Sequence, residues 1–374
     1  MATYEIAAPK VSTRCVALVF LLFLTQSGAT GAGQTRPFYM GFTPWPWNSS
    51  TSAVVDTYNF INNHADLISH HIEEGVPWVE AVEGKPFPPE MVSGWELRKN
   101  TTKKDMKVFL SLTPLNQERN GMALNRGAAY QTPLPESFRN LSLDDPKVKV
   151  AYLNYVKRAV DFFHPDYLAI TVEANELLEN NPALWPAFVN LYQYVYAQLK
   201  AIYPQLPVFF TVSLHNLENP TRGNVDDRWR KIGELWSHSD LIGVSFYPFL
   251  QYPLDLSDPL RSLAKVKSAA NKPIAITEAG YPAQPSIIRS LASLPATPEI
   301  QRDIYYGLLK AASEDSYKFV VMWSYRDYDK LWNAIKDQTP EWGALWKDVG
   351  MLDENANKRP SFDVWNLFYS MPKQ

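Results

Sequence analysis

Short runs of apolar and β-branched residues recur along the chain, and a stretch with helical periodicity follows most of them. The eight runs lie at 38–42, 66–72, 107–112, 167–172, 208–213, 241–246, 274–277 and 319–323. They are continuously apolar rather than alternating, which is typical of parallel strands buried on both faces. Their starts are roughly 30 to 60 residues apart, a spacing that suits repeated strand–helix units with some long loops.

The segments between these runs predict amphipathic helices. A capping sequence at 142–146 predicts the start of a helix that runs through Phe162. Segments 182–202, 259–270 and 298–313 also have helical spacing of apolar residues. Eight strands with helices between them predict one domain over residues 31–374, an α/β fold of the (β/α)₈ or TIM-barrel type.

The main alternative architecture is a doubly wound open sheet. Such a sheet usually carries a glycine-rich, phosphate-binding turn after its first strand. Residues 41–47 read GFTPWPW at that place, and each proline removes a backbone N–H that a phosphate would need. The barrel is therefore the favoured fold, and no cofactor is expected.

The first 30 residues have the pattern of a secretory signal peptide. Lys10 and Arg14 precede an apolar run at 15–24, and small residues fill 27–33. The apolar run is too short to span a bilayer as a mature helix, although a retained signal anchor is the alternative. We therefore expect a cleaved signal at 1–30, an extracellular or periplasmic protein, and no membrane association after cleavage.

Composition and charge restrict the partners. The formal net charge is −3 and no run of Lys or Arg occurs, so nucleic acid is not an expected partner. The single cysteine, Cys15, lies in the predicted signal, and the mature chain would have no disulfide. Possible glycan acceptors are Asn48, Asn100 and Asn140. We expect a monomer.

Candidate chemistry gathers where the predicted strands end, which is where active sites lie in barrels of this kind. The side chains at those ends include Trp45, Trp47, His71, Asn175, Glu176, His215, Tyr247, Glu278 and Trp323. Glycoside hydrolysis needs two carboxyl groups that flank the scissile bond. The fourth and seventh strands lie across the barrel mouth from each other, so Glu176 and Glu278 suit this pair.

Several of these segments resemble clan A glycoside hydrolases. Residues 170–176 read ITVEANE, similar to the Asn-Glu end of that clan's fourth strand, and 274–282 read IAITEAGYP, similar to its nucleophile strand. Residues 242–249 read IGVSFYPF, which resembles the sixth strand of the arabinogalactan endo-β-1,4-galactanases, glycoside hydrolase family 53. The clan's strand-two arginine is absent, and 69–72 read SHHI instead.

The resemblance implies a secreted, retaining β-glycoside hydrolase that acts on a β-linked glycan by double displacement. It implies Glu176 as acid/base and Glu278 as nucleophile. It also implies that Asn175 binds the sugar 2-hydroxyl, that Tyr247 donates to Glu278, and that Trp323 forms the floor under the sugar ring.

Alternatives remain for several of these assignments. Glu173 competes with Glu176 as the acid. His71 and His215 are expected to hydrogen-bond a sugar rather than bind a metal, because a metal site usually needs three protein ligands. The alternative function is a non-catalytic carbohydrate-binding barrel, although such a protein would usually lack one of the two carboxylates. Candidates for outer sugar subsites are Trp45, Trp47, Trp78, Trp332, Trp342 and Trp346, of which two or three are expected to be core or rim packing instead.

Overall fold

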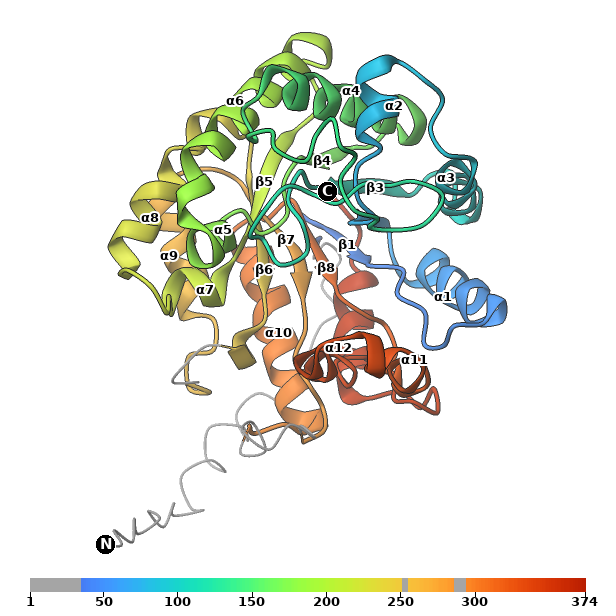
Figure 1. Ribbon diagram of the computed structural model, residues 1–374. Coiled ribbons are helices and arrows are strands. Elements are labelled where there is room, and N and C mark those ends of the chain that lie inside the picture. Colours follow the sequence, from blue (N-terminus) through green and yellow to red (C-terminus); the bar gives the residue numbers. More distant parts are fainter. Residues whose placement is uncertain (1–34, 251–254, 286–293) are drawn as a thin grey trace, which may run out of the picture. The chain divides into compact units, whose positions relative to one another are not determined.

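The computed structural model describes residues 35–250, 255–285 and 294–374. The predicted signal peptide, residues 1–30, lies outside the described residues. Arg36–Gln374 form one compact unit. Within this unit eight parallel strands, β1 to β8, close into a barrel in chain order, with helices around it (Figure 1). The predicted (β/α)₈ fold is therefore confirmed.

All eight predicted strands are present, and most of their bounds are within one or two residues of the prediction. The strands are β1 (Tyr39–Phe42), β2 (Leu67–Ile72), β3 (Lys107–Leu112), β4 (Tyr167–Ala169), β5 (Val208–Ser213), β6 (Ile242–Phe246), β7 (Ile274–Ala279) and β8 (Phe319–Met322).

Helices fill the connections, and the four helical segments expected from the periodicity are present. The α-helices are α1 (Thr51–His64), α2 (Trp78–Glu83), α3 (Pro89–Thr101), α4 (Pro146–Phe163), α5 (Glu176–Asn180), α6 (Trp185–Ile202), α7 (Leu214–Glu218), α8 (Val225–Gly233), α9 (Arg261–Ala270), α10 (Pro298–Glu314), α11 (Asp329–Ile335) and α12 (Pro360–Tyr369). Short 3₁₀ helices are η2 (Pro182–Leu184), η3 (Trp236–His238), η4 (Pro248–Leu250), η6 (Lys336–Gln338) and η7 (Glu341–Trp346). None of the helices in the described ranges has the length and apolarity that crossing a bilayer requires.

β4 is shorter than predicted. The expected strand ran to residue 172, but the ladder with β3 ends at Ala169. Glu173 has a φ of +50°, a left-handed conformation that turns the chain out of the extended path. The Glu173 N–H donates to Thr211 Oγ1 at 2.8 Å, so the turn stays attached to β5. This turn brings the predicted acid residues onto the barrel mouth.

Near the amino ends of the strands, aromatic side chains fill the barrel interior. Phe109 lies between Phe209 and Phe319, with ring centroids 5.6 and 5.0 Å away. Gly243 of β6 faces this layer, and a Cβ there would lie 2.9 Å from the Phe209 ring and 2.8 Å from Thr211 Cγ2. Only glycine fits at this position. The interior is therefore a packed core, and a substrate site belongs at the mouth.

A His-x-Asp sequence precedes three of the even-numbered strands, at 64–66, 164–166 and 238–240. Each aspartate accepts a hydrogen bond from a backbone N–H of the preceding strand, at Met40, Val108 and Val208. Each also pairs with a cation, namely Arg36, Lys107 and Lys200. These aspartate clamps tie β1 to β2, β3 to β4 and β5 to β6 at the amino ends of the strands.

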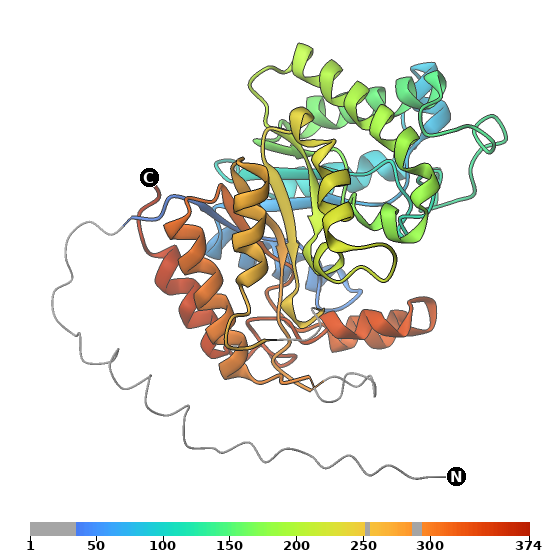
Figure 2. The ribbon, with the colours of Figure 1, turned by 90° about the vertical axis from the view of Figure 1, so that its left-hand side faces the viewer.

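The two ends of the described barrel pair with each other at this same face. Arg36 forms a parallel bridge with Lys373, its N–H donates to the Pro372 carbonyl, and the Gln374 N–H donates to the Arg36 carbonyl, each at 3.0 Å. The C terminus and α11, which follows β8, lie on opposite sides of the barrel (Figure 2).

Candidate active site

Glu278 reaches the barrel mouth through an irregularity in β7. The β6–β7 register shifts between Val244 and Ser245, so that Thr277 is an extra residue and Ser245 pairs with Glu278. A bulge of this kind re-aims the side chain beside it. The Glu278 side chain is 12% exposed, so that it is accessible at the mouth and yet largely enclosed by protein.

Each oxygen of the Glu278 carboxylate has its own donor. The Tyr247 hydroxyl donates to Oε2 at 3.0 Å, which is the bond that the family resemblance implied. His71 Nδ1 lies 3.1 Å from Oε1. Burial, and then the Glu278 charge, raise the pKa of Tyr247 well above its usual value, so the phenol remains a donor across the working pH range.

His71, at the end of β2, contacts two carboxylates. Nδ1 faces Glu278, and Nε2 lies 3.2 Å from Glu73 Oε1. Ser111 Oγ is also 3.2 Å from Nδ1. Burial by itself would lower the pKa of His71, but the charges and hydrogen bonds of Glu278 and Glu73 outweigh it and raise this pKa to about 10. His71 therefore carries a positive charge beside Glu278.

Glu73 is held in turn by Arg119, a residue that the sequence analysis did not identify. Arg119 Nη2 lies 2.5 Å from Glu73 Oε1 and Nη1 lies 3.1 Å from Oε2. Burial opposes ionisation of Glu73, but the charge of Arg119 and the bond from His71 prevail and lower the pKa of Glu73 to about 2. Arg119 comes from the long connection between β3 and α4, where no periodic pattern marks it.

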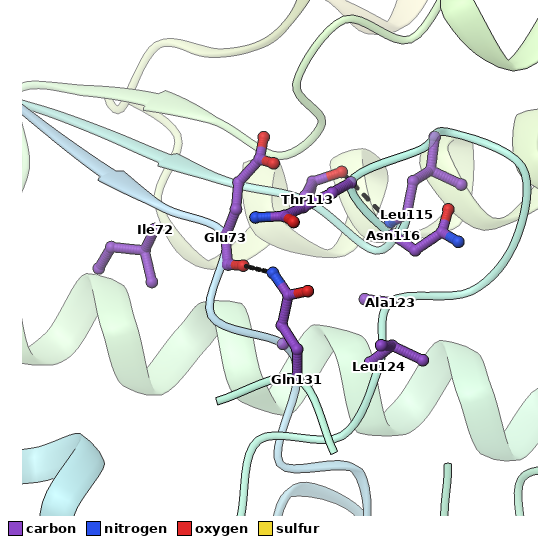
Figure 3. Close-up of a pocket in the computed structure, with 10 residues that line it drawn as sticks. Ile72, Glu73, Thr113, Leu115, Asn116, Ala123, Leu124 and Gln131 are labelled. Carbon is purple, nitrogen blue, oxygen red and sulfur yellow. Dashed lines mark hydrogen bonds between the residues drawn. The ribbon is translucent and has the colours of Figure 1, made fainter. Parts of the chain in front are cut away.

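A pocket lies beside Glu73, lined by this same connection (Figure 3). Gln131 Nε2 donates to the Glu73 carbonyl at 2.9 Å, and the Leu115 N–H donates to Thr113 Oγ1 at 3.2 Å. The long connection thus holds the backbone of Glu73 as well as its carboxylate.

Two glutamates follow β4, and both have a raised pKa. Burial, and then the charges of Glu176 and Glu278, raise the pKa of Glu173 well above its usual value, although Arg119 opposes this. Burial raises the pKa of Glu176, opposed by Arg119 and by a hydrogen bond from Ser213. Arg119 Nη2 lies 3.9 Å from Glu173 Oε2. In both glutamates the protonated form is therefore favoured relative to an ordinary glutamate. We call His71, Glu73, Arg119, Glu173 and Glu176 the charged sector.

Asn175 lies fully buried between these two glutamates. Its Nδ2 donates to the Ser213 carbonyl and to Asn216 Oδ1, and its Oδ1 accepts from the Ser213 N–H at 2.8 Å. These bonds tie the end of β4 to the end of β5. Sugar binding by Asn175 stays a prediction. His215 hydrogen-bonds Ser213 Oγ at 2.9 Å, and burial lowers its pKa to about 4.

Aromatic rings gather beside β8 and β1. Trp45 lies 5.0 Å from Trp323 and 5.9 Å from Tyr328 between ring centroids. Trp346 is 5.5 Å from Tyr247, and Trp332 packs in the same cluster. We call Trp45, Trp323, Tyr328, Trp332 and Trp346 the aromatic sector. Its contact with the charged sector is the edge-to-face pair of His71 and Trp323, 6.3 Å apart.

The remaining candidate tryptophans have different surroundings. Trp47 lies under the cations of Arg326 and Lys330, at 4.2 and 5.1 Å from its ring centroid. Trp342 is 60% exposed and lies 5.7 Å from Trp346. Trp78 is wrong as a subsite residue, because it is fully buried and donates its Nε1–H to the Ala123 carbonyl.

Within the described ranges, one group of acidic side chains has the spacing of a metal site. Carboxylate oxygens of Asp327, Asp329 and Asp348 lie within 4.8 Å of one another. Arg359 pairs with Asp327, and Lys347 pairs with Asp329 and Asp348. Each of the three carboxylates thus pairs with one of two cations, so the group has the character of an ion-pair network that holds the region after β8. His71 and His215 contact carboxylate or hydroxyl groups, as described above.

Comparison with known proteins gives structural relatives only. No family model matches the chain, and no curated protein matches it. The catalytic domain of a GH53 enzyme from Ignisphaera aggregans superposes with a TM-score of 0.59 at 17% identity, covering 91% of this chain and 98% of that one. The chain shares the fold of a glycoside hydrolase.

Two further relatives agree with that result. Fungal β-1,4-galactanases superpose with a TM-score of 0.58 at 14% identity, over 88% of this chain and 99% of theirs. Xylanase 10B from Thermotoga maritima superposes with a TM-score of 0.55 at 13% identity, over 89% of this chain and 95% of that one. At such identities the likeness concerns the fold, and the chemistry has to be argued from the side chains.

Proposed function

We propose that the protein is a retaining β-glycoside hydrolase in which Glu278 is the nucleophile and Glu176 is the acid/base. The observation that carries this proposal is the Glu278 carboxylate, which has a hydrogen-bond donor on each oxygen, from Tyr247 and His71. Donors of this kind stabilise the ionised form and orient it. Burial raises the pKa of both glutamates after β4, which favours a carboxyl that carries a proton.

The proposed reaction has two displacements. In the first, the acid gives its proton to the glycosidic oxygen, the bond from that oxygen to the anomeric carbon breaks, and a Glu278 oxygen bonds to the carbon. In the second, the same residue, now a carboxylate, takes a proton from water, and the water oxygen displaces Glu278. The sugar leaves with its original anomeric configuration.

We propose a β-linked glycan as the substrate and export through the predicted signal. The aromatic sector supports the first point, since flat apolar rings suit the apolar face of a pyranose. β-1,4-Galactan is the first polymer to test, because two of the structural relatives are a GH53 domain and β-1,4-galactanases. Mannan, mixed-linkage glucan and aryl β-glycosides complete the set of substrates.

The decisive experiment is proton NMR of the first product from a β-linked oligosaccharide, recorded before mutarotation. We expect the β-anomer first. The α-anomer first would indicate an inverting reaction, which requires a wider separation of the two carboxyls. Binding without turnover of any substrate would support the non-catalytic sugar-binding barrel instead.

A specific observation favours a second candidate for the acid. Glu173 interacts electrostatically with both Glu278 and Tyr247, and its left-handed backbone is a conformation that non-glycine residues adopt mainly where the surroundings impose it. Glu176 has the sequence pattern in its favour. The two residues lie three positions apart on one turn, so they form a matched pair of variants.

Glu176→Gln and Glu173→Gln separate the two candidates. We expect the alkaline limb of the pH–rate profile to move or vanish in Glu176→Gln, while an aryl glycoside with an activated leaving group is still cleaved. The alkaline limb of the pH–rate profile should be unchanged in Glu173→Gln. The reverse pattern would transfer the role of acid to Glu173.

A further inference from the structure

The Glu278 carboxylate is one end of a row of alternating charges. Glu278 Oε1 faces His71 Nδ1 at 3.1 Å, His71 Nε2 faces Glu73 Oε1 at 3.2 Å, and Glu73 Oε1 faces Arg119 Nη2 at 2.5 Å. All of these side chains are largely enclosed by protein, with exposed fractions between 5% and 19%. In such surroundings each charge interacts strongly with its neighbours.

The geometry of His71 favours a doubly protonated ring. A neutral imidazole has one N–H, and its other nitrogen presents a lone pair. Here both ring nitrogens face a carboxylate oxygen, so a neutral ring would place a lone pair against Glu278 or Glu73. An imidazolium donates to both carboxylates. It then supplies the positive charge next to the proposed nucleophile.

We propose that Glu73 is a positioning residue for the reaction: it keeps His71 protonated and aimed, and so holds the Glu278 carboxylate in place. This role rests on the proposed function of Glu278. Glu73 is suited to it because both of its oxygens bind Arg119 and its carbonyl accepts from Gln131. Glu73, which orients the imidazole, is therefore itself held at both its carboxylate and its backbone.

Other groups around the ring also affect the protonation of His71. Ser111 faces Nδ1 from β3, and Trp323 meets the ring edge-on from β8. Tyr247 bonds the other Glu278 oxygen, and Glu173 lies near Arg119. The largest opposing effect is burial, which by itself would lower the pKa of His71. Loss of the Glu73 charge should therefore let His71 lose its proton at a lower pH.

The chain offers a control at the neighbouring position. Glu74 is a partly buried glutamate that pairs with Arg98 and Arg126, whereas the carboxylates at His71 are those of Glu278 and Glu73. Glu73→Gln and Glu74→Gln both remove one partly buried carboxylate from the same segment. Only the first removes the partner of His71. Glu73→Asp retains the charge on a shorter arm.

The first measurement does not depend on any activity. In the full-length protein with ¹⁵N-labelled histidine, NMR follows the protonation of His71 with pH. We expect the wild-type ring to remain protonated beyond pH 9, and to titrate at clearly lower pH in Glu73→Gln but not in Glu74→Gln. A wild-type ring that loses its proton near the ordinary histidine value of about 6.5 would overturn the proposal, even if no variant folds.

The second measurement uses an aryl β-glycoside that the wild-type protein cleaves. Glu73→Gln should lower kcat/KM about 10- to 100-fold, as is typical when the residue that orients a functional group is lost. Its pH–rate profile should begin to fall at lower pH than that of the wild type, because His71 loses its proton earlier, and Glu73→Asp should recover part of the rate. Glu74→Gln should lower kcat/KM less and leave the pH dependence of the wild type unchanged.

The possible results separate the two ideas. Equal pH–rate profiles for Glu73→Gln and Glu74→Gln would reduce Glu73 to a structural ion pair and overturn its positioning role. If the wild-type protein cleaves none of the glycosides while His71 titrates as expected, the proposed function fails and the charge arrangement stands.

Discussion

The charged sector and the aromatic sector lie side by side at the barrel mouth but are built in different ways. In the charged sector, Glu73 and His71 are fixed by hydrogen bonds and by a loop arginine, Arg119. In the aromatic sector, Trp45 and Trp323 are fixed by ring contacts. Hydrogen bonds between charged groups are directional, and a buried charge needs a partner. Aromatic rings instead provide a large apolar contact area. The first arrangement suits bond cleavage, and the second suits binding of a sugar face.

The largest effect is expected from loss of the Glu278 carboxylate, which His71 of the charged sector contacts. Glu278→Ala should lower kcat by at least about 10⁴-fold, in the range seen when a nucleophile is removed, without loss of the fold, because the residue lies at the mouth. Azide should restore part of the rate with an activated aryl β-glycoside and yield the α-glycosyl azide. Glu314→Ala, at an exposed helix end, is the control, and near wild-type turnover in Glu278→Ala would remove Glu278 from the mechanism.

The charged sector should also make stability depend on pH. The pKa of Glu73 is lowered to about 2 in the folded state, so its stabilisation is complete above its unfolded value and is lost as pH falls toward 2. The pKa of His71 is raised to about 10, so its stabilisation is complete below about 6.5 and is lost as pH rises to 10. The raised pKa values of Glu173 and Glu176 act in the same direction as His71.

Together these shifts predict that the stability contributed by this sector is greatest near about pH 4.5. It falls as the pH drops because the contribution of Glu73 is lost, and also as the pH rises because of Glu173, Glu176 and then His71. Urea unfolding midpoints at pH 3, 5.5 and 9 measure this dependence. Glu73→Gln should flatten the profile on both sides, because it removes one titrating group and the partner of the other. A profile as steep as that of the wild type would mean that other groups govern the dependence.

The aromatic sector should affect binding more than chemistry. Trp323→Ala removes the proposed floor under the sugar and should raise KM about tenfold, which corresponds to about 1.4 kcal/mol, with a smaller change in kcat. Trp323→Phe keeps a flat ring and should lie between the two. Should kcat fall while KM stays constant, Trp323 would belong with the catalytic groups rather than with the binding surface.

The smallest effect is expected at the edge of the aromatic sector. Trp342 is exposed and touches the sector only through Trp346. Trp342→Ala should leave the thermal midpoint and the hydrolysis of short aryl glycosides within error, since exposed positions contribute little to stability. Weaker action on long oligosaccharides alone would make Trp342 an outer subsite, and no change with any chain length would exclude it.

The sequence predicts the fold because apolar periodicity is local and repeats eight times. It also predicts the contact of Tyr247 with Glu278, because the short segments around β6 and β7 resemble a known family. The predicted end of β4 is three residues beyond the observed one, because the turn at Glu173 depends on its bond to Thr211 of the next strand. That bond cannot be read from either segment alone.

Arg119 could not be predicted for a similar reason. It lies in a connection without periodicity, and it reaches Glu73 across 46 positions of sequence. The sequence alone could not say which of the six candidate tryptophans are core, because a tryptophan after a strand is consistent with a sugar platform and with core, and the burial of Trp78 decides its case. The His-x-Asp sequences were available as a signal, because the same spacing recurs before β2, β4 and β6.

The pairing of the two ends of the barrel determines which face of the protein remains accessible when the protein is attached to a surface or to another protein. Arg36 and Gln374 meet at the amino ends of the strands, whereas Glu278 and its partners lie at the carboxyl ends. A surface, bead or fused protein joined at Gln374 would therefore leave the mouth free for a polymer. Orientation on a support would follow from the fold itself, without any engineered linker to direct it.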